Sequence, residues 1–183
     1  MGRLRSLLCS PLLLPRLLAP AAARALIDAD VARWNEILRL EGLLPLLRMR
    51  EFRNLYLYRL RAGGGLAWIV GRLLTTVWRP EPTLYLNAGE IGPGLFIQHG
   101  FATIVTAERV GTNCWINQQV TVGFKDRSGS PVLEDDVVVH AGAKVIGPIT
   151  VGAGSTVGAN AVVVRDVPPG TNAVGVPAHR SHS

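Results

Sequence analysis

Cysteine is scarce in this chain of 183 residues, with only Cys9 and Cys114 present. Two cysteines do not make the disulfide framework of a small secreted protein, so the sequence predicts a protein of the reducing cytoplasm. Cys114 follows the aliphatic Val110 by four residues, a spacing at which small side chains recur further along the chain. It is therefore expected to pack in the core rather than to react.

An unbroken apolar run long enough to cross a membrane is also missing. Residues 1–26 are rich in leucine and hold four arginines and no acidic residue, but three prolines and Arg16 interrupt the apolar stretch. A membrane-spanning helix needs about 20 consecutive apolar residues. The segment is predicted to be a basic N-terminal arm, and peripheral contact of this arm with anionic lipid is the second hypothesis.

Excess positive charge is missing from the second part of the chain. The formal net charge is +6, but residues 1–80 carry 13 Arg and Lys against 5 Asp and Glu, whereas residues 81–183 carry 6 against 8. Neither a zinc-ligand pattern nor a basic strand with interleaved aromatic residues is present. The sequence therefore predicts no nucleic-acid partner.

An aliphatic residue recurs at every sixth position from Leu133 to Val163. A period of six does not keep one side of an α-helix apolar, because the helix has about 3.6 residues per turn. It fits a parallel β-coil with three flat faces, each placing one aliphatic side chain inward. The same spacing occurs upstream with two irregular steps. A seven-residue step from Ile97 to Ile104 predicts a one-residue bulge, and an eleven-residue step after Val122 predicts a loop.

Stacking these coils predicts three inward columns and four coils, above the roughly three repeats that such a fold needs. The columns are Ile91, Val110, Leu133 and Val151; Ile97, Ile116, Val139 and Val157; and Ile104, Val122, Val145 and Val163. The chain is thus predicted to be mainly β, with a parallel β-helix over residues 83–170 and a C-terminal tail over 171–183.

Residues 27–82 are predicted to form a small α-helical region in front of the β-helix. Apolar residues from Ile27 onward follow the spacing of one helix face, and Pro45 ends or kinks that helix. A second helix is expected from Met49 to Leu60 and a third from Leu66 to Val77. Trp34 and Trp68 are expected in the core of this region.

His99 lies two positions after the inward Ile97, beside the predicted bulge. In the stacked coils its column continues with Gln118, Ala141 and Ala159, and the small later members predict a groove for a thin, extended ligand. An imidazole at the end of such a groove can take a proton from a hydroxyl group that attacks an activated acyl group. His99 is therefore the candidate general base.

Five short motifs between residues 88 and 180 occur in a specific order. They are residues 91–100 (IGPGLFIQHG), 119–123 (QVTVG), 141–147 (AGAKVIG), 158–163 (GANAVV), and 166–170 with 175–178 (DVPPG and GVPA). This series resembles the hexapeptide-repeat acyltransferases, and the serine O-acetyltransferases most of all. The resemblance implies a left-handed parallel β-helix, a homotrimer, acetyl-CoA as co-substrate between neighbouring subunits, and His99 as the base, with no metal.

The resemblance assigns residues to acetyl-CoA, and the stacked coils supply candidate residues for the acceptor. For acetyl-CoA it implies Gly123 near the thioester, the backbone of four residues along the pantetheine arm, and Lys144 and Arg180 at the phosphates. The four backbone positions are Ala141, Gly142, Ala159 and Asn160. The acceptor is expected to be a small molecule with a hydroxyl group. Its candidate ligands are polar side chains of the coils beside His99 and one cation of the predicted loop: Gln98, Asn117, Gln118, His140 and Arg127.

The chain departs from the family pattern at positions that bear on the acceptor. Leu84 and Gln98 stand where long-form serine acetyltransferases carry Asp, and Gly129-Ser130 replaces an Arg-His pair. L-Serine is the leading acceptor, and a sugar or natural-product hydroxyl is the alternative. A different class, a non-catalytic scaffold or a metal lyase, also remains. The lyase needs three convergent histidines, and only His99 and His140 lie in the repeats, in different columns.

Overall fold

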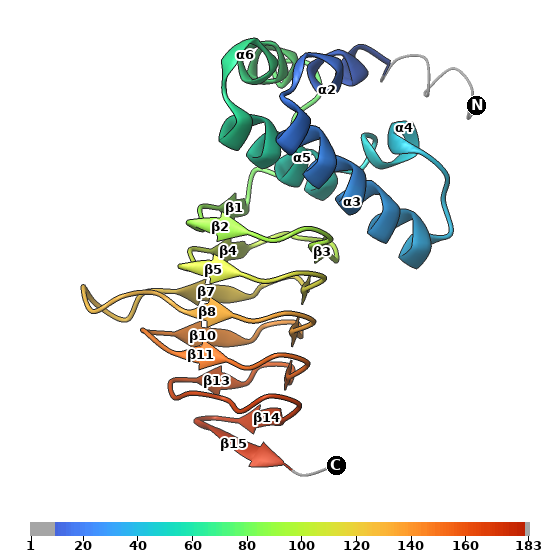
Figure 1. Ribbon diagram of the computed structural model, residues 1–183. Coiled ribbons are helices and arrows are strands. Elements are labelled where there is room, and N and C mark those ends of the chain that lie inside the picture. The colour runs from blue at the N-terminus through green and yellow to red at the C-terminus, as the bar shows by residue number, and fades with distance from the viewer. Residues whose placement is uncertain (1–9, 182–183) are drawn as a thin grey trace. The chain divides into compact units, whose positions relative to one another are not determined.

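The computed structural model describes residues 10–181 of the chain, and the side chains of residues 10–177. Cys9 and the start of the predicted basic arm lie outside the described residues. The chain divides into a helical unit that ends at Pro82 and a β unit that begins at Thr83. Figure 1 shows the helices in blue to green and the stacked strands in green to red.

From Ser10 onward, the helical unit contains one short 3-10 helix and five α-helices. They are η1 (Ser10–Leu13), α2 (Leu14–Leu18), α3 (Ala21–Leu38), α4 (Leu43–Leu46), α5 (Arg50–Gly63) and α6 (Gly65–Leu74). Helix α3 begins directly after Pro20, six residues before the predicted start at Ile27. Much of the predicted arm is therefore helical. Helix α5 ends at Gly63 and is capped by Gly64, whose φ of 66° is a conformation that glycine adopts without strain.

The core of the helical unit forms where α3, α4 and α5 meet. Trp34 is fully buried and meets Phe52 edge to face, with 5.0 Å between ring centroids. The prediction for Trp34 is confirmed. Trp68 is only half-buried on α6, so its predicted place in the core is wrong. The inner face of α6 consists of the smaller Ala67 and Gly71, which let α6 pack closely on α5.

One buried ion pair joins α3 to α5. The guanidinium of Arg59 donates from Nε to Asp30 Oδ2 at 2.8 Å and from Nη2 to Asp30 Oδ1 at 3.0 Å. Both side chains are almost completely excluded from solvent. The planar guanidinium matches the two carboxylate oxygens, and this geometry compensates for part of the cost of burying both charges.

The β unit consists of short strands that wind into three parallel sheets, the faces of a prism (Figure 1). The strand order is β1-β4-β7-β10-β13 in the five-stranded sheet, β11-β8-β5-β2 in the four-stranded sheet, and β15-β14-β12-β9-β6-β3 in the six-stranded sheet. Their bounds are β1 Leu84–Leu86, β2 Glu90–Ile91, β3 Phe96–Ile97, β4 Thr103–Val105, β5 Arg109–Val110, β6 Trp115–Ile116, β7 Thr121–Gly123, β8 Val132–Leu133, β9 Val138–Val139, β10 Lys144–Ile146, β11 Thr150–Val151, β12 Thr156–Val157, β13 Val162–Val163, β14 Asn172–Gly175 and β15 Ala178–Ser181.

Two of the three predicted inward columns are confirmed by the strand register. Ile91 pairs with Val110, Val110 with Leu133, and Leu133 with Val151. The column that begins at Ile97 continues in the same way, and its members are buried. Because each coil contributes one aliphatic side chain to each column, the core grows by about three buried residues per coil.

The third column is predicted wrongly at its first member. Val105, not Ile104, pairs with Val122, and Val105 is fully buried while Ile104 is 43% exposed. Both residues are aliphatic, so the spacing could not distinguish them. Cys114 is buried in the core as predicted, and its burial raises the pKa of the thiol to about 11. The thiol therefore stays protonated at neutral pH and is a poor nucleophile.

The predicted C-terminal tail is structured as far as residue 181. Strand β14 extends the six-stranded sheet, with Ala173 paired to Val157, and β15 turns back to pair antiparallel with β14. Ala173 is buried, so it closes the inward column below Val157. Among residues 10–181, none of the helices combines the length and apolar character that crossing a bilayer requires.

Candidate active site

Most of the predicted site residues share one edge of the prism, where the chain turns from the six-stranded to the five-stranded sheet. We call this edge the histidine corner. Its residues are 98–102, 117–119, 140–142 and 158–160, one group from each of four successive coils. The groups lie one strand spacing apart, about 4.8 Å. The register alone thus brings Gln98, His99, Asn117 and His140 to the same edge.

His99 projects from a bulge that is one residue longer than predicted. Gln98 N–H donates to Ile116 O at 2.9 Å, and Gln119 N–H donates to Phe101 O at 3.0 Å. These bonds set Gln98 opposite Asn117 and Ala102 opposite Gln119. Residues 99–101 of the bulge therefore lie opposite the single residue Gln118 of the next coil. His99 is therefore not stacked on Gln118 as expected. It adopts a φ of 64° and is exposed outside the prism.

Thr103 fixes the backbone that follows the bulge. Its side chain is buried, and its Oγ1 donates to Phe101 O at 3.1 Å and to Asn117 O at 3.4 Å. Leu84, at the position where long-form relatives carry Asp, is itself buried and pairs with Thr103. This position therefore offers the imidazole no carboxylate. The bulge is held by backbone hydrogen bonds and by the hydroxyl groups of Thr83 and Thr103.

Gln98 is oriented by an aromatic neighbour that the sequence analysis missed. Trp115 Nε1–H donates to Gln98 Oε1 at 3.3 Å. The indole in turn meets Phe96 edge to face, with 4.6 Å between ring centroids. Since the amide oxygen is engaged by the indole, Gln98 presents its amide N–H groups as donors. The contact could have been predicted from the sequence, because Phe96 and Trp115 occupy equivalent positions of successive coils.

Asn117 holds a polar atom that lacks a partner within the described part of the chain. Its Oδ1 is buried and accepts no hydrogen bond. Its coil stacks on that of His140, because Asn117 N–H donates to Val139 O at 3.0 Å. A buried oxygen without a donor costs about 1–3 kcal/mol, so it is a candidate acceptor for a ligand N–H or O–H. His140 is exposed on the next coil.

The residues expected along the pantetheine arm continue the histidine corner. Ala141, Gly142, Ala159 and Asn160 lie on its last two coils, where Asn160 N–H donates to Ala141 O at 2.9 Å. Gly142 has a φ of 75°, and a Cβ at this position would collide with the Asn160 side chain. Lys144 Nζ donates to Gln119 O at 2.6 Å, which holds this cation beside the corner.

Three predicted residues lie away from His99 in a single chain. Gly123 ends β7, and Arg127 is exposed in the loop before β8, so both belong to the next edge of the prism. Gly123 is buried and tightly packed, because a Cβ there would lie 2.7 Å from Thr106 Oγ1. The backbone of Arg180 pairs with Ala173 in β15. Its side chain lies outside the described residues.

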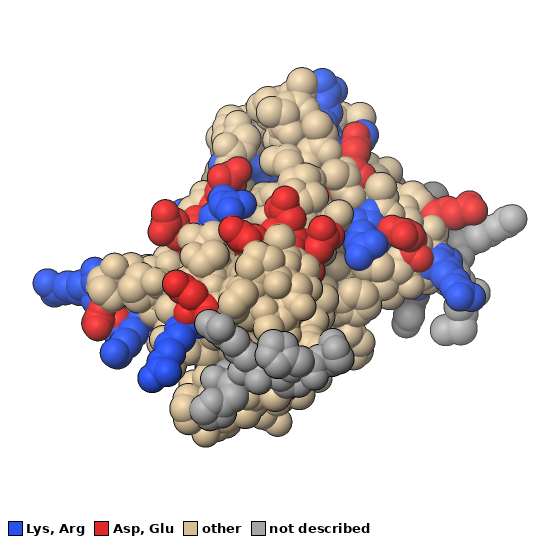
Figure 2. All heavy atoms as spheres, turned by 60° about the horizontal axis from the view of Figure 1, so that its bottom comes forward, with Lys and Arg blue, Asp and Glu red and all other residues tan. Residues whose placement is uncertain are grey.

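Charged side chains of both signs lie on the molecular surface. In Figure 2, basic and acidic side chains lie interspersed over the face shown, and most of the visible surface is neither. Salt screens such alternating charges within about 10 Å. Within residues 10–181 no group of three or more His, Cys, Asp or Glu side chains is arranged to hold a metal ion.

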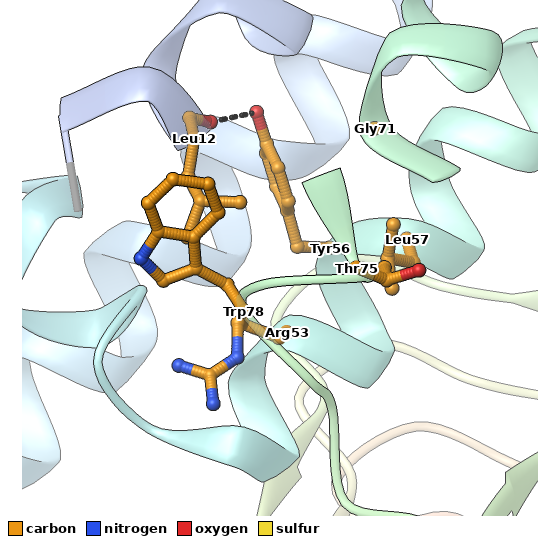
Figure 3. A pocket seen from close by; sticks show the side chains of 7 residues that line it. All are labelled: Leu12, Arg53, Tyr56, Leu57, Gly71, Thr75 and Trp78. Atoms are coloured by element: carbon orange, nitrogen blue, oxygen red, sulfur yellow. Dashed lines mark hydrogen bonds between the residues drawn. The ribbon is translucent and has the colours of Figure 1, made fainter. Parts of the chain in front are cut away.

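A small cavity lies in the helical unit, and none of the candidate site residues lines it (Figure 3). Its walls are Leu12, Arg53, Tyr56, Leu57, Gly71, Thr75 and Trp78. Tyr56 O–H donates to Leu12 O at 2.9 Å, and burial raises the pKa of this phenol. Arg53 is engaged with the carbonyl oxygens of Leu47 and Arg79. The polar groups here stabilise the helical unit.

Comparison with known proteins places these features in a family. Residues 130–165 match the model of the bacterial transferase hexapeptide family (six repeats). A serine acetyltransferase of Helicobacter pylori (strain J99) is 36% identical over 163 residues, covering 85% of this chain and 91% of the relative. A serine acetyltransferase of Escherichia coli (strain K12) is 33% identical over 174 residues, covering 90% of this chain. The chain spans 61% of the length of that longer relative.

Solved structures agree with the sequence relatives. A serine acetyltransferase of Neisseria gonorrhoeae, solved in complex with serine, has a TM-score of 0.67 at 26% identity and covers 87% of this chain and 69% of its own. A serine acetyltransferase in complex with CoA also has a TM-score of 0.67, at 27% identity, and covers 87% of this chain and 70% of its own. The predicted left-handed parallel β-helix is thereby confirmed. With one relative matched along nearly its whole length, the chain belongs to the serine acetyltransferase family of hexapeptide-repeat transferases.

Proposed function

We propose that this chain is an acetyl-CoA-dependent O-acetyltransferase that acetylates L-serine, with His99 as the general base. The observation that carries the proposal is the exposed imidazole on the bulge of the histidine corner, in a chain of this family. Relatives that are named serine acetyltransferases, and were solved with serine and with CoA, support both substrates. The product would serve cysteine formation in the cytoplasm.

The proposed step is a direct transfer between two bound substrates. His99 takes the proton of the acceptor hydroxyl while the hydroxyl oxygen attacks the carbonyl carbon of the thioester. The tetrahedral intermediate then expels the CoA thiolate, which receives the proton from the imidazolium, so the imidazole is restored. General-base assistance of this kind contributes about a hundred- to ten-thousandfold in rate. Bringing both substrates to the imidazole adds to that factor by proximity.

The acetyl-CoA residues support an assembly of more than one chain. We expect the pantetheine arm to follow Ala141, Gly142, Ala159 and Asn160, with Lys144 and Arg180 at the phosphates. Gly123 lies on a different edge of the prism from His99, so one chain does not complete the path. We therefore propose a homotrimer in which neighbouring subunits share each site. Contact of residues 1–26 with anionic lipid is part of the proposal.

A neutral hydroxyl acceptor, such as a sugar, is the second candidate. It is favoured by the uncharged Gln98 and Gly129-Ser130, because the two charged groups of an amino acid are best bound by opposite charges. Arg127 is the cation that we expect to meet the carboxylate of serine.

Purified protein should release CoA thiol from acetyl-CoA when a true acceptor is added. We expect L-serine to be the best of a panel that contains L-serine, L-homoserine and common nucleotide-sugars, because the family relatives are serine acetyltransferases. Thiol release is followed by absorbance with a disulfide reagent, and acetylation is verified by mass spectrometry. A protein silent with serine and active on a sugar would replace the first candidate with the second. Thiol release with no acceptor would be simple hydrolysis.

Asn117→Ala should raise KM for the acceptor by about tenfold, since it removes the buried Oδ1 that we expect to accept an acceptor N–H or O–H. KM for acetyl-CoA should change little. Asn87→Ala, at an exposed asparagine after β1, is the matched control and should leave both constants as they are. An unchanged acceptor KM in Asn117→Ala would remove this residue from the acceptor site.

A further inference from the structure

Helices α2 and α6 expose a continuous set of large apolar side chains. On α6, Leu66, Ile69 and Leu73 recur at the spacing of one helix face and are 55–64% exposed. Leu14, Leu17 and Leu18 are exposed on α2, and Val77 is exposed just after α6. The two helices are neighbours: the Cβ position at Gly71 lies 3.8 Å from Pro15 Cβ. We call these seven side chains the leucine face.

The leucine face is not needed for the core of the helical unit. The opposite side of α6 already packs on α5, because a Cβ added at Gly71 would lie 2.8 Å from Leu60 Cδ1, and Ala67 is also buried. Monomeric soluble proteins rarely leave so many large apolar side chains together in water, and such patches mark a binding surface. The seven outer side chains therefore point to an external partner.

Basic residues predominate in the segments that carry this face, although Arg16 of α2 is paired with the exposed Asp28. Residues 1–27 and 52–80 contain no Asp or Glu. The same segments supply the exposed Arg24, Arg61, Arg72 and Arg79. The sequence before Ser10 adds Arg3 and Arg5 among leucines. Leucine side chains in segments with an excess of arginine are complementary to a lipid surface, which is anionic at its headgroups and apolar beneath them.

We propose that the leucine face binds the surface of an anionic membrane. Leucine and isoleucine side chains would enter the boundary between headgroups and acyl chains, and the arginines would meet lipid phosphates. The helices lie on the surface rather than span it, since none among residues 10–181 is long and apolar enough. A two-fold contact with a second copy of this chain is less favourable, because it would bring the same arginines of both copies together.

The test is cosedimentation of the full chain with phospholipid vesicles. We expect binding to vesicles that contain phosphatidylglycerol, little binding to pure phosphatidylcholine, and loss of binding at high salt. The double variant Ile69→Glu, Leu73→Glu should weaken binding at least about tenfold. Val164→Glu, which places the same charge at an exposed apolar position of the β unit, is the matched control and should bind as the parent does.

Two results would overturn the proposal. Equal sedimentation of the parent and the double variant with anionic vesicles would show that the leucine face does not make the contact. A change in the oligomeric state of the double variant, measured by light scattering after gel filtration, would make this face an interface between copies. Neither readout depends on acetyl transfer, so the proposed enzymatic activity can fail or succeed independently of the membrane contact.

Discussion

Replacing His99 with asparagine is expected to lower kcat for acetyl transfer at least about a hundredfold, because the hydroxyl loses the group that takes its proton. Asparagine is the variant of choice because His99 adopts a φ of 64°, and asparagine tolerates this left-handed conformation better than alanine does. KM for acetyl-CoA should stay close to that of the parent, since the expected pantetheine contacts come from other coils. Thiol release measured at saturating substrates gives kcat directly.

The His99 experiment also separates an enzyme from a scaffold. The bulge lies outside the inward columns, so His99→Asn should unfold at the same denaturant concentration as the parent. His179→Ala, at a histidine of β15, is the control for loss of an imidazole elsewhere and should keep its activity. Undiminished turnover in His99→Asn would remove the proposed base. A parent protein without turnover on any acceptor would favour the scaffold.

The β unit was predictable because its pattern is local and redundant. Each coil has an aliphatic side chain pointing inward at every sixth position. The inward orientation of Val139, Val145 and Val151 could therefore be predicted from the repeated spacing as well as from the residues themselves. The same logic failed at Ile104 and Val105, where both candidates are aliphatic. Only the hydrogen bonds of the bulge decide between them, and these join residues of different coils.

The helical unit was less predictable because its boundaries depend on short signals. Pro20 precedes α3 and Gly64 follows α5, and both residues are readable in the sequence. The alanine-rich start of α3 carries no apolar stripe, so the spacing argument began only at Ile27. Trp68 was expected in the core, but Ala67 and Gly71 occupy the packed side of α6.

Sequence spacing could predict the positions of some candidate site residues but not of others. One inward column contains the residues that directly precede Gln98, Asn117 and His140. The spacing of that column in the sequence therefore predicts that these three residues lie at one edge. The role of Trp115 does not follow from this spacing, because its indole bonds to Gln98 of the neighbouring coil. Arg127 sits in a loop whose conformation has no repeat to define it, and the structure puts that loop at another edge.

Removing the buried carboxylate by Asp30→Ala is expected to lower the free energy of unfolding by about 3–5 kcal/mol. The variant leaves the Arg59 guanidinium buried, where it has lost both hydrogen bonds to Asp30 at 2.8 and 3.0 Å. Equilibrium unfolding in urea, followed by the circular dichroism of the helices, gives the change. Asp28→Ala is the matched control. Its pair with Arg16 has the same 2.8 Å separation, but the Asp28 side chain is 51% exposed. An exposed pair is worth less than about 1 kcal/mol.

The double variant Asp30→Leu, Arg59→Met distinguishes the cost of an unpaired charge from the net contribution of the pair. Apolar side chains of similar size at both positions should recover most of the stability lost in Asp30→Ala, because no charge then remains buried. Equal destabilisation in Asp28→Ala and Asp30→Ala would contradict the argument, since it would mean that burial does not decide the strength of these pairs. A double variant as unstable as Asp30→Ala would instead show that α3 and α5 depend on the ion pair itself.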